Sequence, residues 1–265
     1  RNKMAVYANY HTHTFRCNHA QGSEREYIET ALAAGLTTLG VSDHVPYLFE
    51  NGYYSGFRMR PELAEDYVKT LLSLREEYRG QITILIGFES EYYPALFQKN
   101  LQFLSQYPID YLIQGQHLTK NEYDGAYMGQ PFTDAALLRC YVDQTIEGLA
   151  TGSFSYLAHP DLPNFTGDAD VYRSEMGRLC AYCSEHAVPL EINLLGMVGS
   201  RTILAIVFFK SLRRKDAKEL SDAMHMRRSF CMMRRASQRA KRLHKEQGFP
   251  CCNRSHCAIR LHVCE

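Results

Sequence analysis

The sequence contains no apolar run long enough to cross a membrane, and no charged-then-apolar segment of the secretory type opens it. A membrane-spanning helix needs about 20 consecutive apolar residues. Of the 265 residues, 45% are hydrophobic and 22% are charged, so the chain has enough apolar material for one large core. We therefore expect a cytoplasmic protein that does not bind membranes.

The cysteines lack the spacing of a small, disulfide-linked secreted domain. Cys17, Cys140, Cys180 and Cys183 precede residue 201 without forming such a framework, which favours a reducing compartment. Cys180 and Cys183 have C-x-x-C spacing, but no second pair accompanies them at zinc-site distance. We interpret them as two helix residues that bind no metal.

The last quarter of the chain contains none of the 18 tyrosines and five of the nine cysteines. Residues 1–200 carry 14 of the 30 Lys and Arg and 24 of the 29 Asp and Glu, which leaves 16 basic and 5 acidic residues beyond them. This change of composition divides the chain into residues 1–201 and a basic, Cys-rich tail, residues 202–265.

Paired basic residues in the tail, such as Arg213-Arg214 and Arg227-Arg228, are of the type that contacts nucleic-acid phosphates. No stacking aromatic residues are interleaved with these pairs, and no binding module is recognisable. We therefore expect no nucleic-acid partner. The tail cysteines and His256 have no spacing typical of a zinc module.

Before the tail, short apolar strands alternate with amphipathic helices. The pattern predicts strands over 4–10, 37–42, 82–88, 111–116, 154–158 and 189–193, and helices over 23–35, 62–78, 96–104, 133–149 and 171–186. Ser23 and Glu26 have the spacing of a helix capping box. This alternation is typical of parallel α/β proteins, whose sites lie where the strands end.

Histidine or a carboxylate lies at the end of five predicted strands. His11 and His13 are one residue apart, so they project from the same face of the first strand, and His19 follows them. The other candidates are Asp43 and His44, Glu89, His117, and His159, after the next four strands. One such residue alone is more often structural, but five strand ends with the same chemistry indicate a metal site. Imidazoles around a bridging carboxylate suit zinc, iron or manganese.

Several motifs in a fixed order resemble the PHP (polymerase and histidinol phosphatase) superfamily, and within it the PHP-type histidinol-phosphatases of histidine biosynthesis. They are His11-Thr12-His13, His19-Ala20, Ser42-Asp43-His44, Gly87-Phe88-Glu89, His117 and His159-Pro160, and the resemblance extends from about Met4 to Arg201. It implies a distorted (β/α)7 barrel with three divalent metal ions at the carboxyl ends of its strands.

The resemblance also implies a role for each candidate. His11 and His13 would bind the first metal, Glu89 would bridge the first and second, His117 and His159 would complete the second, and His19 and His44 would hold the third. The implied reaction is metal-assisted hydrolysis of L-histidinol phosphate to L-histidinol and phosphate. The alternatives are another PHP phosphoesterase, acting on a different small phosphate ester or on nucleic-acid ends, and an inactive barrel.

Five further residues are candidates for supporting roles. Asp43 is a candidate catalytic residue that orients a ligand or moves a proton, although it could equally cap a helix. Arg201 is the preferred residue for binding phosphate, because its planar guanidinium suits that group. Arg58 and Arg60, in a loop, are weaker choices, and Glu191 is expected to be a supporting carboxylate inside the barrel.

The sequence departs from the family in one motif. The family places Asp-x-His at the end of its last strand to complete the first and third metals, and this chain has no such motif. Asp222 and His225 have the wrong spacing, so we do not adopt them as ligands. In the neighbouring reading frame, however, the codons of Leu220 to Met226 can encode Ile-Gly-Cys-Asp-Ala-His. Methionine has one codon, which tightly limits these letters.

Our hypothesis is that a one-base shift near Arg201 replaced the native last quarter. We expect the tail to be disordered or ill-packed, because the lost strand leaves barrel strands unpaired and apolar faces uncovered. The exact chain would then be poorly folded or weakly active.

Overall fold

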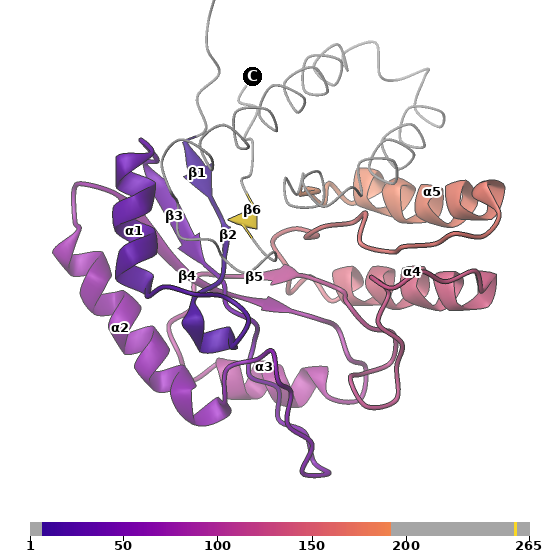
Figure 1. Cartoon of the computed structure of the whole chain (residues 1–265), viewed down its shortest axis with the longest axis horizontal. Helices are drawn as coiled ribbons and strands as arrows, with labels where there is room; N and C mark the ends of the chain where they lie inside the picture. Colours follow the sequence, from indigo (N-terminus) through magenta and orange to yellow (C-terminus); the bar gives the residue numbers. More distant parts are fainter. Residues whose placement is uncertain (1–6, 192–256, 259–265) are drawn as a thin grey trace, which may run out of the picture.

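The computed structural model describes residues 7–191 and 257–258. Four parallel strands form one sheet in the order β1 (Ala8–Asn9), β3 (Thr38–Val41), β4 (Thr83–Ser90) and β5 (Tyr111–Gln114). Parallel bridges extend the pairing from Gln114 to Leu157 and from Leu157 to Leu190. The described part of the chain is therefore a parallel half-barrel of the α/β class (Figure 1).

The predicted strand over 154–158 is shorter in the structure than expected. It contributes isolated bridges at Leu157 and not a full strand, although the Ala158 N–H still donates to the Gln114 carbonyl at 2.8 Å. Within the predicted strand over 189–193, Leu190 makes a parallel bridge to Leu157. Residues 192 and 193 lie outside the described ranges.

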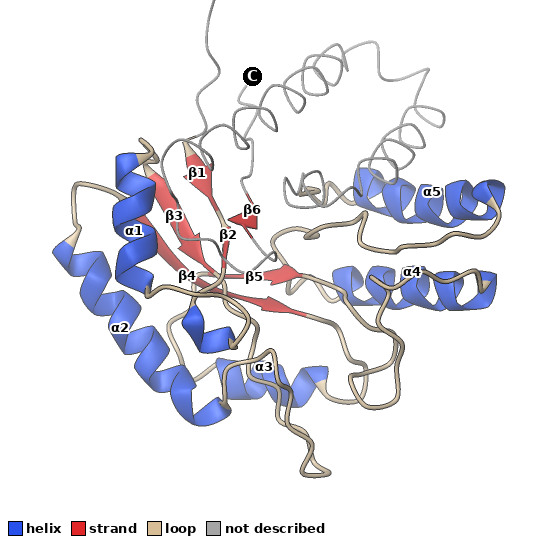
Figure 2. Cartoon of the chain, viewed as in Figure 1, coloured by secondary structure: helices blue, strands red, loops and turns tan. Residues whose placement is uncertain are grey.

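Within residues 7–191, five α-helices connect and cover the strands. They are α1 (Glu24–Ala33), α2 (Ala64–Glu77), α3 (Phe97–Leu104), α4 (Ala135–Ala150) and α5 (Ala169–Glu185), close to the predicted ranges. The capping box of Ser23 and Glu26 is confirmed at the start of α1. Figure 2 shows α1 and α2 along one side of the sheet, and α4 beside α5 at the opposite side.

The side chains of β4 alternate between two environments, as period-two geometry requires. Ile84, Ile86 and Phe88 are buried in the core between the sheet and the helices. Gly87 and Glu89 therefore point into the barrel. This parity places a carboxylate on the inner face at the carboxyl end of the strand.

Tyr111 fills the barrel below that carboxylate. A Cβ at Gly87 would lie 2.5 Å from the Tyr111 ring, so glycine is needed for the close approach. The Tyr111 hydroxyl donates to the Tyr10 carbonyl at 2.7 Å. Ile113 and Tyr156 pack beside these rings. Together these side chains form a small apolar cluster next to the strand ends.

The predicted strand over 4–10 is represented by β1, and β2 (His11–Thr12) follows it directly. Within the tail 202–265, the structure describes β6 (Cys257–Ala258), which pairs antiparallel with β2. The predictions for the rest of the tail concern residues outside the described ranges.

Cys180 and Cys183 are confirmed as helix residues, since both are buried in α5. Across the residues that the structure describes, no helix combines the length and the apolar character that a membrane crossing needs.

Candidate metal centre

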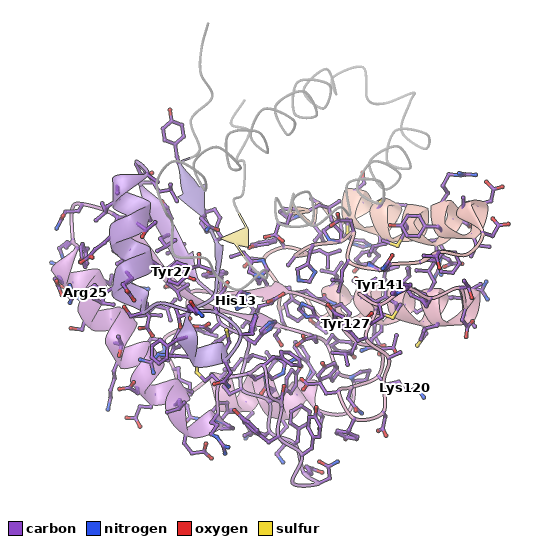
Figure 3. All side chains as sticks on the ribbon, in the orientation of Figure 1. His13, Arg25, Tyr27, Lys120, Tyr127 and Tyr141 are labelled. Atoms are coloured by element: carbon purple, nitrogen blue, oxygen red, sulfur yellow. The ribbon has the colours of Figure 1, made fainter. Side chains whose placement is uncertain are left out.

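Glu89, fully buried at the end of β4, lies at the centre of a cluster of imidazole rings. One carboxylate oxygen, Oε2, lies 3.2 Å from His11 Nε2, 3.0 Å from His13 Nε2 and 3.3 Å from His44 Nδ1. The other, Oε1, lies 2.7 Å from His159 Nε2 and 3.6 Å from His117 Nε2. Five histidines from four segments of the barrel thus converge on one carboxylate. His13, labelled in Figure 3, lies near the middle of the molecule, among the side chains at the strand ends.

Asp43 holds the segment that follows His13. Its two carboxylate oxygens accept hydrogen bonds from the Thr14 backbone N–H and the Thr14 hydroxyl, both at 2.6 Å. Oδ1 also lies 3.9 Å from His13 Nδ1. Burial raises the pKa of Asp43 to about 6, although the Thr14 bonds act in the opposite direction. Asp43 is therefore not a helix cap. Its two hydrogen bonds connect the segment after β3 to Thr14, the residue next to His13.

His19 reaches the same cluster from a 3-10 turn that follows β2. Its ring centroid lies 5.0 Å from that of His13 and 4.8 Å from that of His44. Its Nδ1 lies 3.1 Å from the Cys17 carbonyl oxygen, which orients the ring. The turn is anchored by Arg16, which pairs with Glu24 at the start of α1.

Glu191 supports two histidines on the opposite side of the cluster. Its Oε1 lies 2.9 Å from His11 Nδ1, and its Oε2 accepts the backbone N–H of His159 at 2.8 Å. The φ of His159 is +28°, a conformation that residues with side chains rarely adopt. The bond to Glu191 helps to hold this backbone, so the carboxylate contributes to the placement of the His159 ring.

The protonation states of the cluster favour cation binding. Burial, together with charge on His11 and His19, lowers the pKa of His13 to about 4. Burial also lowers the pKa of His44 well below its usual value. Burial raises the pKa of Glu89, but the imidazoles of His11, His44 and His117 outweigh it and leave that pKa well below normal. Neutral imidazoles beside an ionised carboxylate, as at His13, His44 and Glu89, are ligands that divalent transition metals prefer. His117 differs, because burial lowers its pKa but Glu89 and Glu91 outweigh burial and raise it.

His11 differs from its neighbours because a carboxylate faces each of its ring nitrogens. Burial lowers its pKa, yet Glu191 and Glu89 together raise it to about 10. Without a cation, His11 therefore carries the positive charge that Glu89 and Glu191 require. A divalent ion beside Nε2 would supply that charge instead of the proton.

Among the residues that the structure describes, four groups of three side chains each have ligand atoms within 4.8 Å of one another. They are His11, His13 and Glu89; Glu89, His117 and His159; His44, Glu91 and His117; and His13, Cys17 and His19. The donor atoms thus suit metal ions by their type and by their spacing. The groups share His13, Glu89 and His117.

The family model described as the PHP domain matches residues 9–194. The chain belongs to the PHP family. A probable histidinol-phosphatase of Deinococcus radiodurans is 30% identical over 164 residues, which are 60% of this chain and 62% of that protein. The histidinol-phosphatase of Bacillus subtilis is 29% identical over 101 residues, 37% of this chain and 38% of that protein. The chain thus spans less than two thirds of the length of these curated relatives.

Two solved structures resemble the fold of this PHP protein. One is the histidinol phosphate phosphatase of Lactococcus lactis, solved with zinc, L-histidinol and phosphate, with a TM-score of 0.59, 19% identity, and coverage of 78% of this chain and 82% of that one. The other is a putative histidinol phosphatase of Listeria monocytogenes, with a TM-score of 0.56, 15% identity, and coverage of 80% and 99%. At these identities, the likeness shows the PHP barrel fold.

The structure brings together all seven predicted ligands of the PHP motifs, with Asp43 beside them. Glu191 is inside the barrel in a supporting position, as predicted. Arg201 lies outside the described residues.

One expectation is wrong. Arg58 lies in a loop, as expected, but its side chain is not available for phosphate, because it is 1% exposed and pairs with Glu91 and Glu122.

Sequence reasoning missed Glu91 and Cys17 as members of the site. Glu91 lies two residues after Glu89, and period-two alternation would have placed it on the same face. Cys17 lies between His13 and His19, and no spacing in the sequence distinguishes it from an ordinary buried cysteine. Its thiol hydrogen-bonds to the Thr14 carbonyl at 3.1 Å, and burial raises its pKa.

Proposed function

We propose that the chain is a metal-dependent phosphomonoesterase that hydrolyses L-histidinol phosphate to L-histidinol and phosphate. The observation that carries this proposal is the buried Glu89, surrounded by five imidazole nitrogens at distances of 2.7 to 3.6 Å. The names of the curated relatives supply the substrate. The expected partner is thus a small phosphate ester.

Three divalent ions, of zinc, iron or manganese, are the proposed cofactors. His11, His13 and Glu89 would hold the first, and Glu89, His117 and His159 the second. His19 and His44 would hold the third. Bound divalent ions supply an activated water and neutralise negative charge on the phosphate oxygens. The donor set of the structure fits this role by its chemistry and by its spacing.

The protein groups contribute orientation and charge. Glu89 belongs to two ligand groups and would offer a carboxylate oxygen to each. Its low pKa keeps it ionised, so both oxygens can act as ligands. We propose that Asp43 acts by orienting His13 through Thr14, since both of its oxygens accept bonds from that residue. Arg201 remains the proposed phosphate-binding residue on the evidence of its sequence position.

The test uses the purified full chain, stripped with a chelator and reloaded with zinc, manganese or ferrous ion. We expect phosphate release from L-histidinol phosphate that depends on metal and exceeds release from phosphoserine and p-nitrophenyl phosphate. Equal rates on all three esters would favour another PHP phosphoesterase. Bound metal without hydrolysis of any ester would contradict the proposal.

A second reading has one specific observation in its favour. The sequence lacks the Asp-x-His motif that would complete the first and third metals. The exact chain would then be an inactive barrel that retains the second metal group. The same assay separates this reading, because that group would bind metal without supporting hydrolysis.

A further inference from the structure

Arg58 is an arginine buried almost completely beside the metal centre. Its Nη2 donates to Glu91, its Nε donates to Glu122, and its Nη1 donates to the Val45 carbonyl at 3.2 Å. The aromatic ring of Phe57 lies 4.7 Å from the centre of the guanidinium. A buried guanidinium is stable only when its charge is paired and its donors are satisfied. Two carboxylates satisfy that requirement here.

Glu91 connects this arginine to a predicted metal ligand. While one of its oxygens accepts from Arg58, the other lies 2.6 Å from His117 Nδ1. Glu91 is fully buried and lies between these two partners. A guanidinium can only donate, so the Glu91 carboxylate accepts from Arg58, and its second oxygen is placed to accept from His117 Nδ1.

This bond determines which nitrogen of His117 faces the centre. With the proton on Nδ1, Nε2 is the nitrogen that carries the lone pair, and it lies 3.6 Å from Oε1 of Glu89. Carboxylates that fix the tautomer of a metal-binding histidine in this way also raise its affinity for the ion. If the Glu91 carboxylate could rotate, it would no longer fix the orientation of the His117 ring. The hydrogen bond from Arg58 prevents this rotation.

We propose that Arg58 is a positioning residue for the second metal, acting through Glu91 on the orientation and tautomer of His117. The inference rests on the proposed metal-dependent function and deepens it. Arg58 belongs to the segment between β3 and α2, and Glu122 to the segment after β5. The placement of His117, after β5, thus depends on the packing of the loop that contains Arg58, more than 50 residues earlier in the sequence.

A direct phosphate-binding role for Arg58 does not fit these contacts. Each of its three nitrogens donates to an acceptor within the protein, and the side chain is 1% exposed. A phosphate would have to displace a carboxylate to reach the guanidinium.

The first test compares wild type, Arg58→Met and Arg58→Lys as full chains. Arg178→Met is the matched control, because Arg178 also pairs with two carboxylates, Glu175 and Asp143, but on the outer surface of α4 and α5. Zinc and manganese affinities are measured by chelator competition, together with Tm with and without metal. We expect Arg58→Met to weaken the affinity of one metal equivalent by about 10- to 100-fold. The metal-induced rise in Tm should shrink accordingly.

The control and the conservative variant distinguish a specific effect on metal binding from a general loss of stability. Arg178→Met should leave metal affinity unchanged, and Arg58→Lys should recover part of it, because lysine keeps the charge but not the planar fork. A lower Tm for Arg58→Met without metal, at unchanged metal affinity, would show a structural role and overturn the inference.

A second measurement needs no folded Arg58 variant. Long-range 15N–1H correlation spectra of zinc-loaded wild type report which nitrogen of each histidine carries a proton, and His117→Gln assigns the signals of His117. We expect the proton on Nδ1 of His117. A proton on Nε2 would overturn the inference by itself.

The outcomes separate this inference from the proposed function. Metal binding by the wild type without ester hydrolysis contradicts the function and leaves the role of Arg58 intact. Hydrolysis with equal metal affinity in wild type and Arg58→Met contradicts the role of Arg58 alone. A wild type that binds no divalent metal contradicts both.

Discussion

Glu89 is the residue on which the charge balance of the site depends. Five imidazoles meet its two oxygens, and it belongs to two of the four ligand groups. We predict that Glu89→Gln lowers kcat/KM by at least about 100-fold, because loss of mere supporting partners of metal ligands already costs about 10- to 100-fold. Metal content per chain should fall in parallel. Glu185→Gln, an exposed change at the end of α5, is the control and should have no effect.

Substitutions of Thr14 test whether Asp43 acts by holding the segment next to His13 in place. The side chain is buried, and its hydroxyl donates to Asp43 at 2.6 Å. Thr14→Val keeps the shape but removes this donor, so we predict a loss of about 1.5–3 kcal/mol in the free energy of unfolding, the range for hydrogen bonds to charged groups. Urea unfolding measures it. Thr14→Ser keeps the hydroxyl and should retain most of the stability; an equal loss in both variants would contradict this role.

At the scale of elements, the inner face of the barrel depends on glycine where Tyr111 crosses it. The added Cβ of Gly87→Ala would contact the Tyr111 ring at 2.5 Å. We predict a loss of about 1–3 kcal/mol in the free energy of unfolding, as is usual for an overpacked core. Gly56→Ala is the control, because no atom lies within 4 Å of its Cβ position. If overpacking is the cause, Tyr111→Leu should cost less in the Gly87→Ala background than alone; additive losses would exclude that cause.

The elements themselves were largely predictable from local patterns. Hydrophobic periodicity located the five described helices within two residues at each end, and the Ser23–Glu26 spacing correctly identified the start of α1. The segments 154–158 and 189–193 were harder, because apolar composition indicates burial but does not determine how many residues pair. In the structure, Leu157 and Leu190 make the bridges.

The same limit explains what was missed in the site. Strand parity predicts which side chains share the inner face, and it would have included Glu91. The alternation of side chains along a strand contains no information on the path of a loop. It therefore could not predict that Arg58 contacts Glu91, which is 33 residues away in the sequence. The partners of Arg58 follow from tertiary packing alone.

At the scale of the whole molecule, the family match and the composition divide the chain at nearly the same place. The PHP domain model ends at residue 194, and the tyrosines and the acidic excess end before Arg201. The resemblance implies that the last strand carries two ligands of the metal centre. A PHP protein is therefore expected to keep the family motif in that strand, whereas this sequence lacks it. The neighbouring reading frame restores the Asp-Ala-His letters at the required place, which is why we propose a one-base shift.

The final prediction follows from this discontinuity. Sequencing the gene across codons 195 to 230 should reveal an inserted or missing base near codon 201. A chain carrying the neighbouring-frame tail should then bind three metal equivalents tightly and hydrolyse L-histidinol phosphate, whereas the present chain should bind the first and third metals more weakly and hydrolyse the ester more slowly, because each of these two sites lacks one ligand. Metal analysis after gel filtration, with unfolding curves for both chains, makes the comparison. A clean read in the present frame, with cooperative unfolding and three bound metals, would contradict the shift and require that other residues supply the missing ligands.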